Sequence, residues 1–171
     1  MLMHGSTWLV MRTDEDVAQR SANFGRVIAI VLSVSFIIAG LMVWHNVDGY
    51  LVVSAIDTLG QSQPTIKSVV TSSGAWLTNY KETPLLWLVP ITGILAPFLV
   101  AALLSVKKKS TSVKVTAFIG SSITIISIIL TAGISMFPFV MPSSSHPSHS
   151  LLMWDTVSSE GTLNLMLIVV A

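Results

Sequence analysis

The sequence contains no cysteine and few charged residues. Of its 171 residues 10% are charged, against about 25% in soluble domains, whereas 52% are hydrophobic. The absence of cysteine excludes a disulfide framework and thiol chemistry. Four histidines and eight acidic residues are thinly spread for a catalytic or metal centre, and with a net charge of +1 we expect no nucleic-acid partner. The composition indicates that lipid is the solvent.

Three apolar segments are long enough to cross a bilayer as helices, namely residues 27–44, 85–104 and 115–137. At 1.5 Å per residue they reach about 27, 30 and 34 Å, against a hydrocarbon core roughly 30 Å thick. Residues 1–10 and 163–171 are also apolar but shorter, and we interpret them as partial helices of a fragment that is truncated at both ends. The predicted fold is all-α: one polytopic membrane domain (1–171), an antiparallel bundle of transmembrane helices.

The basic residues predict the orientation of this bundle. Seven of the nine lie in loops 11–26 and 105–114, two lie in loop 45–83, and loop 138–160 has none. Because Lys and Arg accumulate in cytoplasmic loops, the first two loops are predicted to be cytoplasmic and the other two periplasmic. Membrane lipid is therefore an expected partner of the chain.

The third span carries small and hydroxylated residues at helical spacing, among them Gly120 with Thr124, and Ser127 with Thr131 and Ser135. Such a seam allows another helix to approach closely. It would also suit a polar path, so a transporter or channel module is the alternative function. Against that alternative, none of the three spans contains a charged residue, and ion pathways are usually marked by intramembrane ionisable groups.

The third span ends in the unusual stretch MFPFVMPSSS. Pro138 and Pro142 cannot continue a helix, and Ser143 and Ser144 offer hydroxyls to the backbone as it leaves the bilayer. The stretch predicts a rigid, non-helical exit. Further on, Asp155 beside the interfacial Trp154 is interpreted either as the cap of a short helix over residues 156–158 or as part of a subunit contact.

The histidines give no convincing ligand set. His4 is expected at the cytoplasmic end of the first partial helix and His45 at the outer interface, so no histidine is expected at mid-span. His146 and His149 resemble a metal pair, but no cysteine or carboxylate lies in the next five residues to complete a site. We therefore assign no catalytic, cofactor-binding or metal-ligating residue.

Several stretches resemble the same protein family, subunit II of the cytochrome bd quinol oxidases. They cover essentially the whole chain: HGSTWLVMRT (4–13), VDGYLV (47–52), GAWLTNYKETPLLWLVP (74–90) and the region from TAGISMFPFVMPSSS to SLLMWDTVSSEGTLNLM (131–166). The chain is similar to the second half of that subunit, which has two four-helix halves.

The resemblance implies a function. The chain would be a fragment of the subunit that supports a haem-bearing partner, subunit I, in electron transfer from quinol to dioxygen. Haem b and haem d would reside in subunit I, and the fragment alone would not be catalytic. The residues expected at a subunit contact or in a structural role are Pro138, Pro142, Ser143, Ser144, Trp154 and Asp155.

Overall fold

The computed structural model describes residues 1–54, 67–107 and 109–170. It consists mainly of helices and divides into two compact units. Unit 1 comprises residues 1–47 and 77–135, and unit 2 comprises residues 48–76 and 136–171.

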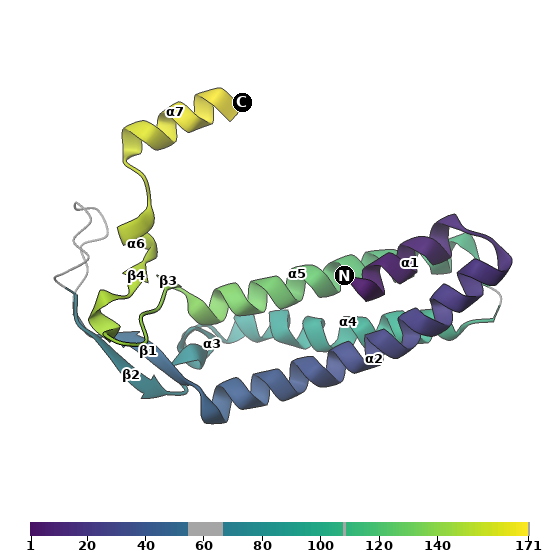
Figure 1. Ribbon diagram of the computed structural model, residues 1–171, viewed down its shortest axis with the longest axis horizontal. Helices are drawn as coiled ribbons and strands as arrows, with labels where there is room; N and C mark the ends of the chain where they lie inside the picture. Colours follow the sequence, from purple (N-terminus) through teal and green to yellow (C-terminus); the bar gives the residue numbers. More distant parts are fainter. Residues whose placement is uncertain (55–66, 108, 171) are drawn as a thin grey trace. The chain divides into compact units, whose positions relative to one another are not determined.

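Unit 1 is a bundle of apolar helices (Figure 1). Helix α1 (Leu2–Arg12) turns into the long α2 (Glu15–Asn46). A short α3 (Thr78–Glu82) and the 3-10 turn η2 (Pro84–Trp87) lead into α4 (Leu88–Ser105), and α5 (Thr111–Met136) follows.

Within the described residues, three helices have the length and hydropathy to span a membrane. They contain the predicted spans except for Phe137, which follows the end of the third helix. The predicted polytopic helical membrane fold is therefore confirmed. Residues 15–26, which the charge pattern assigned to a loop, form instead the first three turns of α2. Two of the arginines that suggested a loop, Arg20 and Arg26, lie exposed on this extension, and Arg12 is the last residue of α1.

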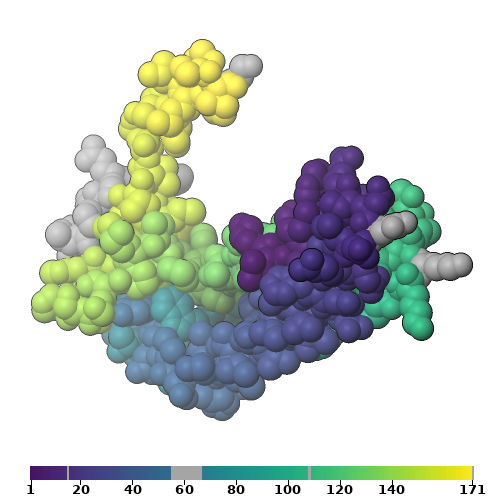
Figure 2. Space-filling model, turned by 45° about the vertical axis from the view of Figure 1, so that its right-hand side comes forward, coloured from purple at the N-terminus to yellow at the C-terminus, as the bar shows by residue number. Residues whose placement is uncertain are grey.

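Small residues let the helices of unit 1 approach closely. The core combines alanines of α2, α4 and α5 (Ala22, Ala29, Ala101, Ala117) with larger apolar side chains, among them Met3, Val10, Val100 and Leu104. A Cβ added at Gly120 would lie 3.0 Å from the Val100 side chain, and one at Gly25 would lie 2.8 Å from the Ser6 Cβ. In the space-filling view, the purple residues of α1 lie against the start of α2 (Figure 2).

Pro97 lies inside α4 and is buried, whereas Pro90 lies in the first turn of that helix. A proline in the first turn removes an N–H group that has no helical acceptor anyway. Pro97 is therefore the proline that interrupts the hydrogen bonding of α4.

Unit 2 contains short strands, which the sequence did not predict. Strands β1 (Asp48–Val52) and β2 (Val69–Ser73) pair antiparallel, with Asp48 opposite Ser73 and Val52 opposite Val69. Strands β3 (Phe139–Met141) and β4 (Leu151–Leu152) form a second antiparallel pair. Val69, Phe139 and Leu152 form a small core, with Tyr50, Val52 and Trp154 packed around it.

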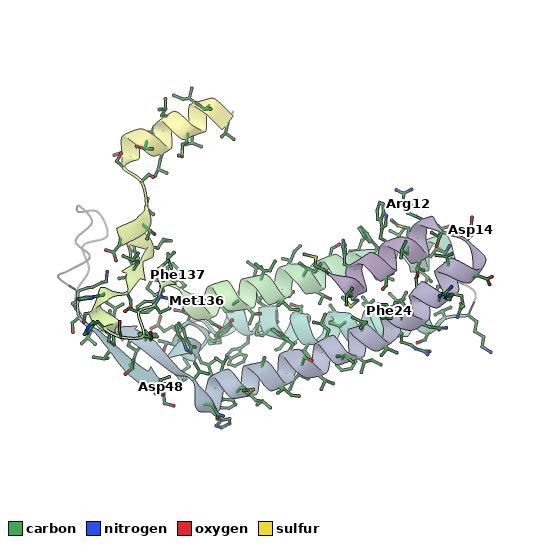
Figure 3. The ribbon with its side chains drawn as sticks, in the orientation of Figure 1. Arg12, Asp14, Phe24, Asp48, Met136 and Phe137 are labelled. Atoms are coloured by element: carbon green, nitrogen blue, oxygen red, sulfur yellow. The ribbon has the colours of Figure 1, made fainter. Side chains whose placement is uncertain are left out.

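The remaining elements are short. The 3-10 turn η1 (Ala75–Leu77) follows β2, η3 (Pro147–His149) precedes β4, and α6 (Met153–Thr156) follows it. Helix α7 (Glu160–Val170) is apolar but too short to span a bilayer. Figure 3 locates three landmarks: Asp14 at the turn between α1 and α2, Asp48 at the start of β1, and Met136 at the end of α5.

Candidate functional site

The predicted exit from the third span is a folded structure in unit 2. The peptide bond from Phe137 to Pro138 is cis, and the Pro138 carbonyl accepts a hydrogen bond of 2.9 Å from the Met153 N–H. The ring of Phe137 packs edge-on against that of Trp154, with centroids 6.1 Å apart. The two predicted segments, the exit and the stretch around Trp154, are thus brought together.

The serine-rich turn after the exit satisfies its own polar groups, as predicted. The Ser143 N–H donates to the buried Ser150 Oγ (3.0 Å), and the Ser143 Oγ accepts from the His146 N–H (3.3 Å). Ser144 is exposed and Pro142 is half-buried. Ser148 joins this turn to the first hairpin, because its Oγ accepts a hydrogen bond from the Val69 N–H (3.3 Å).

Asp155 forms a buried ion pair with Lys67. The Lys67 ammonium group donates to Asp155 Oδ2, and the two side chains are 5% and 9% exposed. The same carboxylate oxygen accepts from the Leu152 N–H (2.9 Å). Burial raises the pKa of Asp155, but the hydrogen bonds from Lys67 and Leu152 and the lysine charge outweigh it, so the pKa lies below its usual value.

The expected cap over residues 156–158 is wrong. Helix α6 begins at Met153, so Asp155 lies inside it and its carboxylate reaches back to the Leu152 N–H. Sequence reasoning did not identify Lys67 as its partner. The available signal was the scarcity of basic residues in the predicted outer loops, where Lys67 was one of only two.

Three aromatic rings of unit 2 pack against one another. Tyr50 lies 5.6 Å from Trp76 and 5.8 Å from Phe139, centroid to centroid, and Trp76 lies 6.5 Å from Phe139. Such contacts are worth about 0.5–1.5 kcal/mol per pair beyond the buried area. The sequence analysis had not identified Phe139 or Ser150 as part of this site.

His4 lies in the first turn of α1, away from the Arg12 end that was predicted to be cytoplasmic, and this corrects the sequence interpretation. It precedes Arg12 by eight residues, or about 12 Å of helix. Its Nδ1 lies 2.8 Å from the Ser121 Oγ, and Ser121 is six residues inside the third predicted span. The His4 ring packs on Phe118, with centroids 4.6 Å apart. One histidine is therefore at membrane depth.

The hydroxyls of α5 mainly bond to backbone carbonyls and to neighbouring helices. Ser121 also contacts Thr7 of α1 (2.9 Å between their hydroxyl oxygens), and Ser127 contacts Thr92 of α4 (3.1 Å). Thr124 donates to the Gly120 carbonyl (2.9 Å). These contacts favour the packing role of the seam over a polar path.

Two side chains near the start of α4 bind the last turns of α5. The Tyr80 hydroxyl donates to the Thr131 carbonyl (3.0 Å), and the Asn79 amide donates to the Ile134 carbonyl (2.7 Å). Tyr80 is fully buried and its ring packs on Trp87.

Replacing Tyr80 with phenylalanine is expected to destabilise unit 1 by about 1–2 kcal/mol, because the Thr131 carbonyl loses its donor while the ring is kept. Thermal unfolding of the purified protein in mild detergent measures this. Tyr50→Phe is the matched control, since no hydrogen bond of its hydroxyl is described and its ring contacts remain. Equal losses in the two variants would contradict the assigned role.

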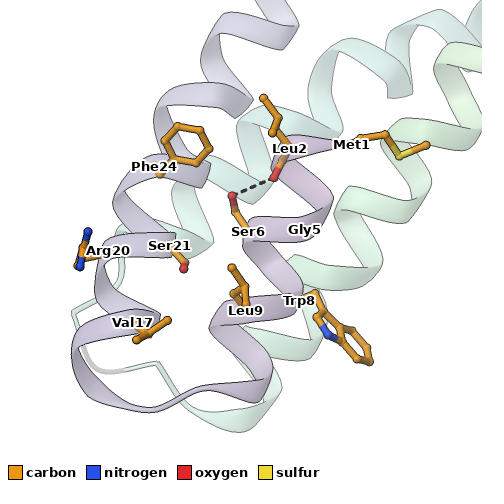
Figure 4. Close-up of a pocket in the computed structure, with 10 residues that line it drawn as sticks. All are labelled: Met1, Leu2, Gly5, Ser6, Trp8, Leu9, Val17, Arg20, Ser21 and Phe24. Atoms are coloured by element: carbon orange, nitrogen blue, oxygen red, sulfur yellow. Dashed lines mark hydrogen bonds between the residues drawn. The ribbon is translucent and has the colours of Figure 1, made fainter.

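A groove of about 870 Å³ lies between α1 and the first turns of α2 (Figure 4). Its lining is mostly apolar, including Leu9, Val17 and Phe24. The Ser6 hydroxyl at its wall is bonded to the Leu2 carbonyl (2.9 Å). Because specificity for a polar ligand needs convergent polar groups, the groove does not indicate a catalytic site.

Comparison of the sequence with protein families and with curated proteins shows which family the chain belongs to. The family model described as cytochrome bd terminal oxidase subunit II matches residues 1–171. The chain belongs to the cytochrome bd terminal oxidase subunit II family. The resemblance noted from the sequence is thus confirmed.

Two curated relatives are similar over nearly the whole chain. One is the "Probable cytochrome oxidase subunit 2" of Haemophilus influenzae, 44% identical over 168 residues, or 98% of this chain and 43% of the relative. Another is the "Cytochrome bd-I ubiquinol oxidase subunit 2" of Escherichia coli K12, 43% identical over 166 residues, or 97% of this chain and 42% of the relative. The chain thus spans less than half the length of these subunit II relatives.

Proposed function

We propose that this chain forms part of subunit II of a quinol:dioxygen oxidoreductase and supports a haem-bearing subunit I. The observation that carries the proposal is the 43% identity to a ubiquinol oxidase subunit 2 across 97% of the chain. The complex would take electrons from quinol and reduce dioxygen in the respiratory chain of a bacterial inner membrane. Haem b and haem d would belong to subunit I, and this chain alone would not be catalytic.

The histidines of the chain support the assignment of the haems to the partner. Among the described residues, His146 and His149 are the two histidines whose rings contact each other, with centroids 5.1 Å apart, and both side chains are exposed in unit 2. His45 is exposed and stacks on Trp44, and His4 is bonded to Ser121. Among the described residues no three metal-ligating side chains converge. The described histidines do not fit a buried haem held between two of them.

A chimera tests the proposal. The matching 166 residues of the Escherichia coli subunit would be exchanged for this chain, and the chimera would be expressed with its natural partner. We expect an assembled complex that oxidises ubiquinol and shows the haem bands of the native complex in reduced-minus-oxidised spectra. A chimera that inserts into the membrane but recruits no haem-bearing partner would overturn the proposal.

The contact with the partner would involve the exposed surface of the exit. Val140 and Met141 are 52% and 64% exposed, and Pro142 and Ser144 lie beside them. Pro138, Ser143, Trp154 and Asp155 make contacts within unit 2 and would hold that surface in shape. In this proposal Asp155 supports the contact without touching the partner.

Met141→Ser is expected to weaken association with the partner at least tenfold while leaving the stability of unit 2 unchanged, because the side chain is exposed and β3 pairs through its backbone. Dissociation on dilution in detergent, followed by size-exclusion chromatography, measures it. Val53→Ser is the control, a 65% exposed apolar residue of the same unit. Unchanged association of the Met141 variant would exclude this surface.

The positions of the basic residues predict that loops 11–26 and 105–114 are cytoplasmic and that loops 45–83 and 138–160 are periplasmic. Cysteine at the exposed Ser144 should react with an impermeant thiol reagent in intact cells, and cysteine at Ser110 should react only after lysis. The absence of native cysteine removes background labelling. The opposite labelling pattern would show that the predicted orientation in the membrane is wrong.

A further inference from the structure

Three basic residues from three segments lie at one end of unit 1, where the charges of Arg26 and Lys114 act on Lys109. Arg26 lies on α2, Lys109 lies in the turn between α4 and α5, and Lys114 lies in the first turns of α5. The α4–α5 turn lies at the same end of the bundle as the first half of α2 (Figure 1). The approach is close, because a Cβ added at Gly25, next to Arg26, would lie 3.0 Å from Leu104 Cδ1 near the end of α4.

The charges of this basic cluster (Arg26, Lys109 and Lys114) are not balanced by a described carboxylate. Burial and the charges of Lys114 and Arg26 lower the pKa of Lys109. Lys109 and Lys114 are half-buried. The described ion pair is that of Lys67 and Asp155 in unit 2, so among the described side chains no carboxylate lies within ion-pair distance of the cluster. A bound anion would relieve this repulsion.

The surroundings of the cluster identify the kind of anion. Val27, Val106 and Val115 are exposed apolar side chains, each next to or within a few residues of a member of the cluster. Val27 and Val115 begin two of the predicted spans, and Val106 directly follows the end of α4, so the cluster is expected at the depth of the lipid headgroups. A soluble anion would use the cations alone, whereas a lipid would use both the cations and this apolar surface.

We propose that Arg26, Lys109 and Lys114 bind the phosphate group of an anionic phospholipid, whose acyl chains lie along the exposed valines. The positive-inside rule accounts for the presence of basic residues in this turn. It does not account for their convergence from three segments or for the partial burial of two of them. This site is independent of the proposed oxidase function.

The test uses the full-length protein, delipidated in mild detergent and titrated with phosphatidylglycerol or with phosphatidylcholine in native mass spectrometry. We expect tighter binding of phosphatidylglycerol. Each removed cation should weaken that binding about 5-fold, the factor equivalent to about 1 kcal/mol per basic residue at a membrane surface. Lys109→Gln with Lys114→Gln should therefore lose roughly 25-fold and approach the affinity for phosphatidylcholine.

Three comparisons can overturn the proposal. Lys81→Gln removes an exposed lysine elsewhere in unit 1 and should leave the preference for phosphatidylglycerol intact. If this variant lost as much lipid affinity as the cluster variants, the preference would come from the net charge of the protein and not from the basic cluster. Inorganic phosphate should not displace the lipid, and efficient displacement would make the site one for a soluble anion. Unchanged binding in the double variant, with helix content preserved by circular dichroism, would exclude the basic cluster altogether.

Discussion

Asp155→Asn is expected to lower the free energy of unfolding of unit 2 by about 3–5 kcal/mol, because it leaves the Lys67 ammonium group buried without a counter-charge. Removing one partner of a buried ion pair costs more stability than the intact pair contributes in net free energy. The reason is that the remaining charge is then buried with neither water nor a counter-charge around it. Thermal unfolding in mild detergent, followed by tryptophan fluorescence, measures the loss; Trp76 and Trp154 report on this unit.

Two variants show whether the loss comes from the buried charge. Asp48→Asn makes the same change at an exposed carboxylate of the same unit and should have little effect. Adding Lys67→Met to Asp155→Asn removes the unpaired charge and should recover much of the stability, because the asparagine oxygen can still accept from the Leu152 N–H. A double variant no more stable than Asp155→Asn would contradict the assigned cause.

The same ion pair predicts how stability depends on pH. The pKa of Asp155 is lower in the folded protein than in the unfolded chain, so the folded state favours the ionised carboxylate. Its contribution to stability is therefore complete above the unfolded pKa, about 3.9. It is lost as pH falls through the lower folded value. Asp155→Asn should remove this part of the acid sensitivity.

The membrane spans could be predicted from the sequence because a bilayer demands long apolar runs. Residues 27–44 and 85–104 lie within the helices found, as do residues 115–136 of the third predicted span. The extension of α2 back to Glu15 could not be predicted, because the arginines in this segment are typical of a cytoplasmic loop. The depth of His4 became apparent only once α1 was placed beside Ser121. A hydrophobicity pattern carries no information on such pairings between distant residues.

In unit 2, contacts between residues distant in the sequence were even harder to predict. The prolines and serines of the exit predicted a rigid, non-helical turn, because proline and serine act on the backbone locally. Lys67 and Asp155 are 88 residues apart, and strands of two to five residues give little periodicity to detect. The resemblance to a family identified the segments of the site, but the contacts between them come from the fold.

The two glycines of α2 provide a matched pair of sites for testing how the bundle of unit 1 packs. Gly25→Ala is expected to destabilise the protein by about 1–3 kcal/mol, because its new Cβ would lie 2.8 Å from the Ser6 Cβ on α1 and 3.0 Å from the Leu104 side chain on α4. Gly40→Ala, in the same helix, meets nothing within 4 Å and should stabilise the protein by up to about 1 kcal/mol through helix propensity.

Because both changes add the same methyl group to the same helix, their difference isolates the contact between α1, α2 and α4. Ser6→Gly removes the atom that the new Cβ at position 25 would meet most closely, so Gly25→Ala with Ser6→Gly should be less destabilised than the sum of the two single variants. Thermal midpoints of the four proteins in mild detergent provide the comparison. Shifts of the same sign and size at Gly25 and Gly40 would mean that α1 does not pack against α2 as described, and the position of His4 beside Ser121 would then lose its support.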